Sequence, residues 1–151
     1  MFVKNKKKSK FIGFTLIEIM LVVALIVAIG GISAPVYQIF QNKNNLSGAS
    51  DIISQTLKRA QLLSQAVDGD SSWGVYIGSG SVVLFKGLSY ASRDSSFDEI
   101  FEISSNIIPS GLQEIHFSKL YGYPQTTGSI TLTSSDNETI FLTINSSGMI
   151  E

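Results

Sequence analysis

The sequence predicts an α+β fold in which a long N-terminal helix packs on an antiparallel β-sheet head. The chain has an unbroken apolar stretch near its start, helical three- and four-residue spacing up to residue 67, and short β-type segments after residue 68. A helix that supports a sheet formed by later segments is an α+β arrangement. We therefore divide the chain into a basic leader at 1–13, an apolar helix at 14–35, an amphipathic helix at 36–67 and a β-rich head at 68–151.

Charge and composition exclude several function classes. The 151 residues include 11 basic and 12 acidic side chains, but five lysines lie in the first 13 residues, and the remainder carries a net charge of −6. A body this acidic argues against a surface that binds polyanions. The absence of cysteine excludes disulfides, thiol nucleophiles and thiolate metal sites, and a single histidine excludes a multi-histidine metal cluster. We expect no cofactor.

The segment 14–34 has the length and composition of a membrane span. It contains one charge, Glu18, and at about 1.5 Å per residue it extends roughly 31 Å, close to the hydrocarbon thickness of a bilayer. Apolar residues occupy every face of this helix, unlike those of a half-buried surface helix. Because five lysines precede the span, we expect a single pass with a cytoplasmic N-terminus and an outward-facing head.

Two residues distinguish this segment from a plain anchor or a cleaved signal peptide. Glu18 places a carboxylate inside the apolar run, and an intramembrane carboxylate is a functional hypothesis by default. Pro35 directly follows Ala34, which argues against ordinary signal-peptide cleavage at that bond. Together with Gly30 and Gly31, Pro35 marks a place where the helix can bend.

The residues from Lys10 to Glu18 read Lys-Phe-Ile-Gly-Phe-Thr-Leu-Ile-Glu. With the basic leader and the apolar span, they resemble the processing site of type IV pilins and type II secretion pseudopilins. The resemblance implies that a prepilin peptidase cuts after Gly13 and methylates the new N-terminal residue, Phe14. It also implies that Glu18 is the family's acidic residue in subunit assembly and that Pro35 is its conserved proline.

Physical reasoning connects this processing to assembly. Cutting after Gly13 would remove the leader lysines and create an amine at Phe14, and N-methylation would keep its charge. Glu18 lies four residues further on, on the same helix face. Because a buried carboxylate needs a partner, the Phe14 amine of a neighbouring subunit could pair with Glu18 and set the axial register of a filament.

The second half of the helix shows an apolar stripe suited to packing on the head. The polar run at 41–45 either interrupts the helix or is solvated, and from Leu46 the period is clear. The stripe comprises Leu46, Ala49, Ile53, Leu57, Ala60, Leu63 and Val67, widened by Ile52, Leu62 and Ala66. We expect the helix to end at the sequence Asp-Gly-Asp-Ser-Ser that begins at Asp68.

The remaining chain predicts strands separated by turns and two longer loops at 87–97 and 121–127. Expected strands cover 73–77, 81–86, 99–103, 113–118, 129–133 and 139–144. A first hairpin turns at 78–80, and a last hairpin joins the final two strands across 134–138. This order of helix, first hairpin and C-terminal strand resembles that of H-type minor pseudopilins and related minor pilins. The pilin-like fold is therefore what the family resemblance implies.

Asp68 and Asp70 are the weak candidates for a metal site. Their oxygens suit calcium, which some secretion pseudopilins bind in the head, but the spacing is not that of an EF-hand. A solvated turn that ends the helix explains them fully and is the preferred interpretation. Lys58 and Arg59 form the only adjacent basic pair after the leader, too little for a nucleic-acid surface.

Catalytic readings have simple structural alternatives. His116 fits an exposed strand position opposite Ile115 and Phe117, and the chain offers no clear triad partner. The carboxylates of the 98–102 segment could act as a pair in glycoside hydrolysis, or could belong to a solvated acidic loop. Trp73 fits an anchor between sheet and helix.

The sequence thus predicts a structural subunit, not an enzyme, that belongs to a type IV pilus or a type II secretion pseudopilus. Expected partners are other pilin or pseudopilin subunits, the prepilin peptidase, an inner-membrane assembly platform, and lipid before assembly. The expected location is the cytoplasmic (inner) membrane, and then a periplasmic or extracellular filament. The alternatives are a signal-anchored extracytoplasmic binding domain that does not polymerise, and an anchored hydrolase with a polar cleft at His116 or at 98–102.

Overall fold

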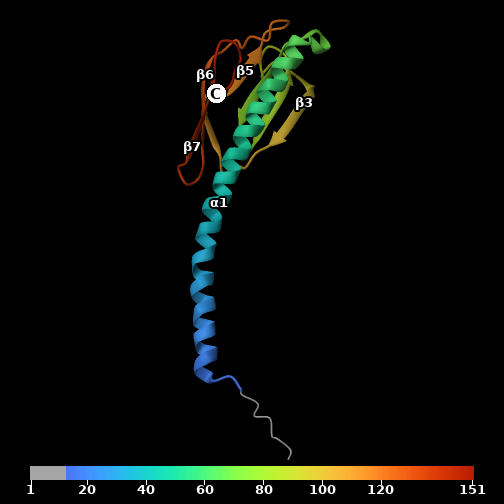
Figure 1. The fold of residues 1–151 in the computed structure, drawn as a ribbon. Helices are drawn as coiled ribbons and strands as arrows, with labels where there is room; N and C mark the ends of the chain where they lie inside the picture. The colour runs from blue at the N-terminus through green and yellow to red at the C-terminus, as the bar shows by residue number, and fades with distance from the viewer. Residues whose placement is uncertain (1–12) are drawn as a thin grey trace, which may run out of the picture. The chain divides into compact units, whose positions relative to one another are not determined.

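The structure, a computed structural model, describes residues 13–151, apart from the side chains of residues 32–35. The leader lysines and the side chain of Pro35 lie outside the described residues. The described chain is α+β, with one long helix, α1 (Leu16–Gln65), a short 3₁₀ turn, η1 (Asp68–Asp70), and antiparallel strands (Figure 1). Its contacts define two units, one ending at Tyr37 and one spanning Gln38–Glu151.

Helix α1 continues through the polar run at 41–45, so of the two alternatives for that run the solvated segment is observed and the interruption is not. That run contains no glycine or proline, the two residues that most disfavour a helix interior. The helix ends at Gln65, two residues earlier than predicted, because Val67 adopts a left-handed conformation with φ of 56°. This turn leads directly into η1.

The strands form two antiparallel sheets, whereas the sequence analysis anticipated one. Sheet A has the order β3-β2-β1-β5, and its strands are β1 (Trp73–Gly78), β2 (Ser81–Lys86), β3 (Asp94–Glu102) and β5 (Glu114–Phe117). Sheet B has the order β4-β6-β7, and its strands are β4 (Ile108–Gly111), β6 (Gly128–Thr133) and β7 (Thr139–Ile144).

The two hairpins predicted from turn residues are confirmed. β1 pairs with β2 across Ser79 and Gly80, where Gly80 adopts a positive φ of 84°, a conformation open to glycine without strain. β6 pairs with β7. Two predictions are wrong: β3 begins at Asp94, inside the expected loop at 87–97, and β4 lies in a segment that had no predicted strand.

One hydrophobic core joins the second half of α1 to both sheets. The helix contributes Leu46, Ala49, Ile53, Leu57 and Ala60, each at most 2% exposed. Sheet A contributes Trp73, Val75, Ile77, Val82, Leu84, Ile115 and Phe117, and sheet B contributes Ile130, Leu132, Leu142 and Ile144. The predicted stripe is confirmed over these helix positions. Leu62, expected to widen it, is 64% exposed instead.

Candidate functional site: the apolar helix and the head

The Gly13–Phe14 bond lies just before α1, in residues that are neither helix nor strand. The Phe14 side chain is 80% exposed, and no heavy atom lies within 4 Å of the position that a Cβ would take at Gly13. An uncrowded segment outside helices and strands is the kind of backbone that an enzyme can reach. The bond that the sequence analysis selected for cleavage is therefore accessible in the described chain.

Thr15 directly precedes α1 as its N-cap residue. Glu18 is the third residue of the helix. The Glu18 backbone N–H lies 3.1 Å from the Thr15 carbonyl oxygen and 3.4 Å from its Oγ1. The order Thr-x-x-Glu is that of a capping box, in which the acidic side chain also favours the positive end of the helix dipole. Sequence reasoning missed this local role, although the four-residue pattern carries the signal.

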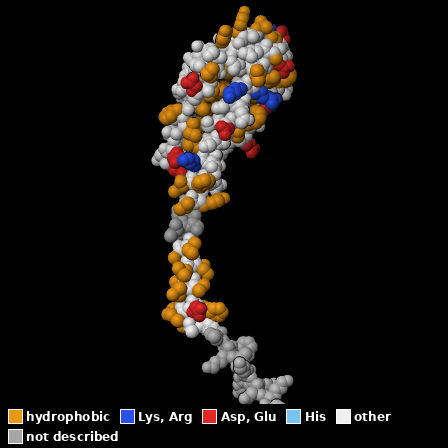
Figure 2. Space-filling view, viewed as in Figure 1, with side chains coloured by type: hydrophobic (Ala, Val, Ile, Leu, Met, Phe, Trp, Pro, Cys, Tyr) orange, Lys and Arg blue, Asp and Glu red, His pale blue; other side chains and the backbone are white. Residues whose placement is uncertain are grey.

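The apolar half of α1 has no cover within its own unit. Its large side chains from Leu16 to Ile29 are 46–80% exposed, and a window of mean hydropathy 2.6 contains no buried residue. Figure 2 shows hydrophobic side chains along this segment. A contiguous exposed apolar surface is typical of segments that contact lipid or another protein. By length and composition, α1 is able to cross a membrane.

Asp68 and Asp70, the candidate calcium ligands, lie in the turn η1, and the Asp70 carboxylate forms an ion pair with a lysine. The Asp68 backbone carbonyl accepts a hydrogen bond from Trp73 Nε1 at 3.0 Å, and Lys119 donates to the Asp70 carboxylate. This hydrogen bond and the lysine charge lower the pKa of Asp70. Among the described residues, no group of three or more acidic or histidine side chains is arranged to hold a metal.

The residues considered for catalysis occupy different places on sheet A. His116 lies on β5 opposite Gly74 of β1 and is half-buried. On β3, the Glu99 carboxylate accepts from Arg59 at 2.6 Å, and Asp98 binds Arg93. Each of these two carboxylates thus has its own arginine: Arg59 of α1 pairs with Glu99, and Arg93 of the loop before β3 pairs with Asp98.

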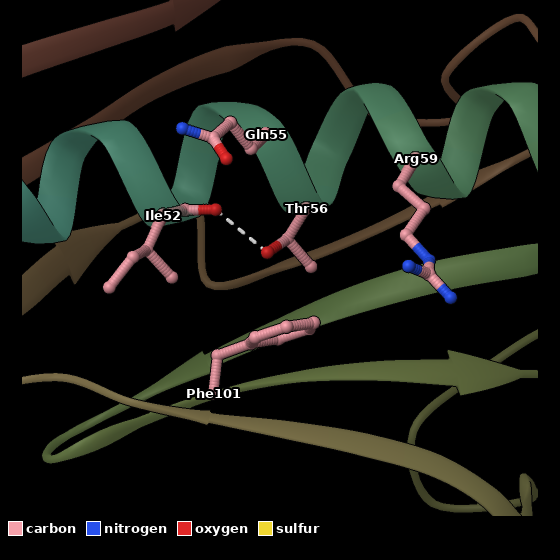
Figure 3. A pocket seen from close by; sticks show the side chains of 5 residues that line it. All are labelled: Ile52, Gln55, Thr56, Arg59 and Phe101. Atoms are coloured by element: carbon pink, nitrogen blue, oxygen red, sulfur yellow. Dashed lines mark hydrogen bonds between the residues drawn. The ribbon is translucent and has the colours of Figure 1, made fainter.

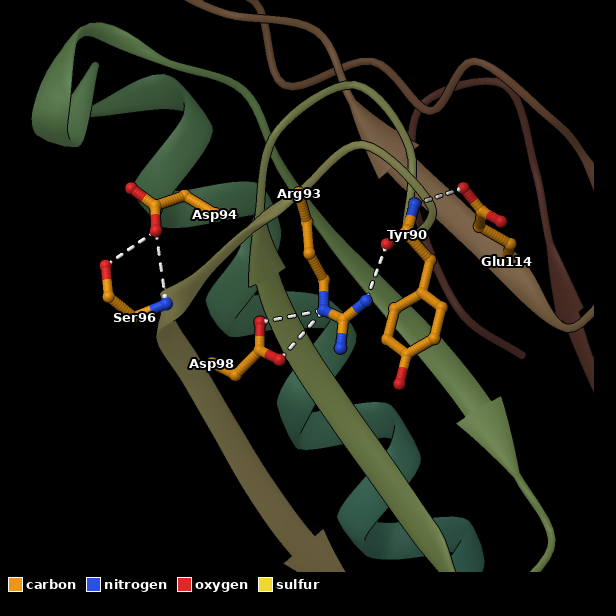
Figure 4. A network of polar contacts seen from close by, with 6 residues as sticks. All are labelled: Tyr90, Arg93, Asp94, Ser96, Asp98 and Glu114. Carbon is orange, nitrogen blue, oxygen red and sulfur yellow. Dashed lines mark hydrogen bonds and ion pairs between the residues drawn. The ribbon is translucent and has the colours of Figure 1, made fainter.

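A network on the outer face of sheet A was missed by sequence reasoning (Figure 4). Arg93 Nε donates to both carboxylate oxygens of Asp98, at 2.8 and 3.1 Å, and its Nη1 donates to the Tyr90 carbonyl at 2.7 Å. The Tyr90 N–H in turn donates to Glu114 at 2.8 Å. Asp98 is only 10% exposed, so it is not part of a solvated acidic loop. Its hydrogen bond and charge raise the pKa of Arg93.

Aromatic stacking reinforces this network. The Tyr90 ring stacks on Tyr76 of β1 at 4.1 Å between centroids, and it meets the Phe85 ring edge-on at 5.7 Å. The Arg93 guanidinium lies 3.7 Å from the centre of the same Tyr90 ring. The loop between β2 and β3 is therefore fastened across the sheet by contacts with residues from all four strands of sheet A.

A pocket of about 150 Å³ lies between α1 and β3 (Figure 3). Its lining comprises Ile52, Gln55, Thr56, Arg59 and Phe101. The Thr56 hydroxyl is already engaged, because its Oγ1 donates to the Ile52 carbonyl at 2.7 Å. The apolar part of the lining is formed by the side chains of Ile52 and Phe101. This lining contains no carboxylate and no histidine, so it is not the polar cleft that the hydrolase alternative requires.

Comparisons with known proteins found no relative: no family model, no curated protein and no solved structure matches the chain.

Proposed function

We propose that this protein is a structural subunit, a minor pilin or pseudopilin, of a type IV pilus or a type II secretion pseudopilus. The observation that carries the proposal is the exposed apolar helix with a single carboxylate in its first turn, directly after an accessible Gly13–Phe14 bond. A signal anchor requires only the apolar surface. The proposed subunit requires all three features, together with the folded head.

In this mechanism, one surface serves two environments in turn. The apolar side chains of α1 contact lipid while the precursor is membrane-anchored, and they contact neighbouring subunits after extraction into the filament. Cleavage after Gly13 leaves a cationic amine at Phe14. Pairing of that amine with Glu18 of a neighbouring subunit satisfies both charges when lipid and water are excluded. The protein itself performs no reaction.

Intact-mass spectrometry of the protein recovered from membranes tests the processing step. In cells that carry a prepilin peptidase, we expect a mass that matches residues 14–151 plus one methyl group. Cells without the peptidase and the Gly13→Leu variant should both retain the leader. A wild-type mass that still includes the leader in the presence of the peptidase would overturn the proposal.

The signal-anchored domain is the second candidate, because a carboxylate at the third helical position after a capping Thr15 suits a capping box and the positive end of the helix dipole without any partner subunit. Two variants separate the roles. Glu18→Gln keeps a residue that suits the capping box but removes the charge, whereas Thr15→Val removes the cap and keeps the carboxylate. If Glu18 pairs with an amine, Glu18→Gln should lower the fraction of subunit in sheared filaments at least about tenfold.

Thr15→Val is the matched control for that assembly assay, and we expect it to enter filaments almost as well as the wild type. Both variants should still be cut after Gly13, as intact mass will show. The opposite result, normal assembly of Glu18→Gln and loss of assembly in Thr15→Val, would assign Glu18 to helix capping and reject the ion pair.

A further inference from the structure

Strand β3 presents an open edge of sheet A. It is the outermost strand of the order β3-β2-β1-β5, and its only strand partner is β2. At the opposite edge, β5 is bridged at Phe117 to Pro124. Among the residues that the structure describes, no backbone hydrogen bond joins the outer side of 97–102 to another segment. An edge of this kind is a template for pairing with another chain.

The direction of the free backbone groups follows from the register. The Ile103 N–H donates to the Gly80 carbonyl, so residue 103 faces the β2 side. In an antiparallel ladder the hydrogen-bonding direction alternates along the strand, which turns Phe101 toward β2. The backbone groups of Ile100 and Glu102 therefore point away from the sheet, toward any strand that approaches this edge.

The side chains of β3 alternate between the face that packs toward α1 and the opposite face of sheet A. Phe101 pairs with Val82, a core residue, and lines the 150 Å³ pocket beside Ile52 on the helix-facing side (Figure 3). A volume of this size accommodates one benzene-sized group. Ile100 lies on the other face and is 65% exposed. A strand added at this edge would place alternate side chains in the pocket and beside Ile100.

Charge determines which partner fits. Glu102 is exposed and forms no ion pair among the described residues, and Asp98 lies two residues before Ile100. Antiparallel pairing of β3 with a second copy of itself, centred on Ile100, would set Glu102 opposite Asp98, whose charge is already paired with Arg93, so a second copy offers Glu102 no cation. Like charges opposite one another destabilise a strand pair, whereas a cationic residue stabilises it.

We propose that β3 takes up an extended segment of a partner protein by strand addition. The segment places an apolar side chain in the pocket beside Phe101 and a lysine or arginine near Glu102. Backbone hydrogen bonds to Ile100 and Glu102 supply affinity, and the pocket and the charge supply specificity. The site lies wholly within Gln38–Glu151 and does not depend on the role proposed for α1.

Hydrogen exchange of the full-length chain in detergent tests the geometry. The probe is a blocked peptide of sequence Lys-Thr-Val-Leu-Val-Thr-Lys, added up to about 1 mM, the scale of weak binding. Without peptide, the Ile100 and Glu102 amides should exchange quickly and the Phe101 amide slowly. With peptide, we expect Ile100 and Glu102 to become protected while Phe101 changes little.

Two substitutions examine the contacts by anisotropy of the labelled peptide. Ile100→Pro removes only an outward N–H, so the β2–β3 ladder is kept while binding weakens about tenfold. Ile100→Val is its matched control and should bind as the wild type does. Glu102→Lys should weaken binding of the lysine-flanked peptide and strengthen binding of the same peptide with glutamate at both ends.

Three results would overturn the proposal. They are no protection of Ile100 and Glu102 at the highest peptide concentration, equal binding by Ile100→Pro and Ile100→Val, or no change of charge preference in Glu102→Lys. Sedimentation of the chain without peptide tests whether a second copy of the chain occupies this edge instead. Dimerisation that Ile100→Pro abolishes would assign the edge to a second copy and reject the cationic partner. Far-UV circular dichroism must first show that each variant is folded.

Discussion

At the residue scale, Ser64 shows how one hydroxyl connects the helix to the sheet. Its side chain is fully buried, and its Oγ accepts the Trp73 backbone N–H at 2.9 Å at the start of β1. The backbone carbonyl of the same serine accepts from Leu120 N–H at 3.0 Å. Ser64 therefore fixes both the entry of the first strand and the loop after β5 to the last turns of α1.

Replacing Ser64 with alanine should destabilise the head, because the buried Trp73 N–H would lose its acceptor. We expect a loss of about 1–3 kcal/mol in the free energy of unfolding. Ser47→Ala, at an exposed position on the same helix, is the control and should change stability by no more than about 0.5 kcal/mol. Urea unfolding followed by far-UV circular dichroism measures both. Equal values for the two variants would contradict the assigned role.

The pKa of Asp94 is lowered because the Ser96 hydroxyl and backbone N–H donate to its carboxylate, at 2.6 and 3.1 Å. A carboxyl whose pKa is lower in the folded chain stabilises the fold above its unfolded pKa. That stabilisation is lost as the pH falls through the folded pKa. The head should therefore lose stability on acidification below about pH 4, with Asp70 contributing in the same direction.

Ser96→Ala should make this acid sensitivity smaller, since it removes the hydroxyl that contributes most to the pKa shift. The measurement is the thermal midpoint as a function of pH. Ser95→Ala, at the neighbouring exposed position, should keep the wild-type profile. A Ser96→Ala profile as steep as that of the wild type would show that the contact does not persist in solution.

At the element scale, α1 is both the support of the head and the carrier of an apolar surface. Leu57 is fully buried in the core, whereas Leu62, little more than a helical turn later, is 64% exposed. Leu57→Ala should lower the free energy of unfolding by about 2–5 kcal/mol. Leu62→Ala should change it by no more than about 0.5 kcal/mol. Denaturant titration compares them, and a similar loss in both would place Leu62 in the core after all.

Several elements could be predicted because local sequence specifies them. Gly78-Ser79-Gly80 marks the β1–β2 hairpin, and the three- and four-residue spacing from Leu46 marks the buried helix face. β4 escaped prediction because Ile108-Pro109-Ser110-Gly111 contains two residues that usually interrupt strands. The start of β3 escaped because Asp-Ser-Ser has low β-propensity and lies on an exposed edge.

The candidate sites also divide into those that local sequence specifies and those that it does not. The accessible bond after Gly13 and the carboxylate at Glu18 belong to a contiguous pattern, which the sequence displays directly. The pocket beside Phe101 depends on non-local packing of β3 against α1. The Arg93–Asp98 contact is only five residues long, but it forms where β3 begins, in a segment that was predicted to be a loop. No spacing along the chain reports which strand lies at an edge.

At the scale of the whole molecule, charge and apolarity are separated along the chain. The basic side chains of the leader precede an apolar helix, and the remainder of the protein is acidic. Under the proposed processing, the leader holds the N-terminus at an anionic cytoplasmic lipid surface, where each lysine contributes about 1 kcal/mol. Its removal would convert a precursor with a net charge of −1 into a subunit with −6.

Trp73, the single tryptophan of the chain, provides an optical reporter of the head. Its side chain is 5% exposed, its indole N–H is held by the Asp68 carbonyl, and its ring meets Phe97 of β3 edge-on at 6.4 Å. The indole thus lies where the end of α1, the first strand and the edge strand meet. Its emission would follow opening of this junction in the native chain, without an introduced dye.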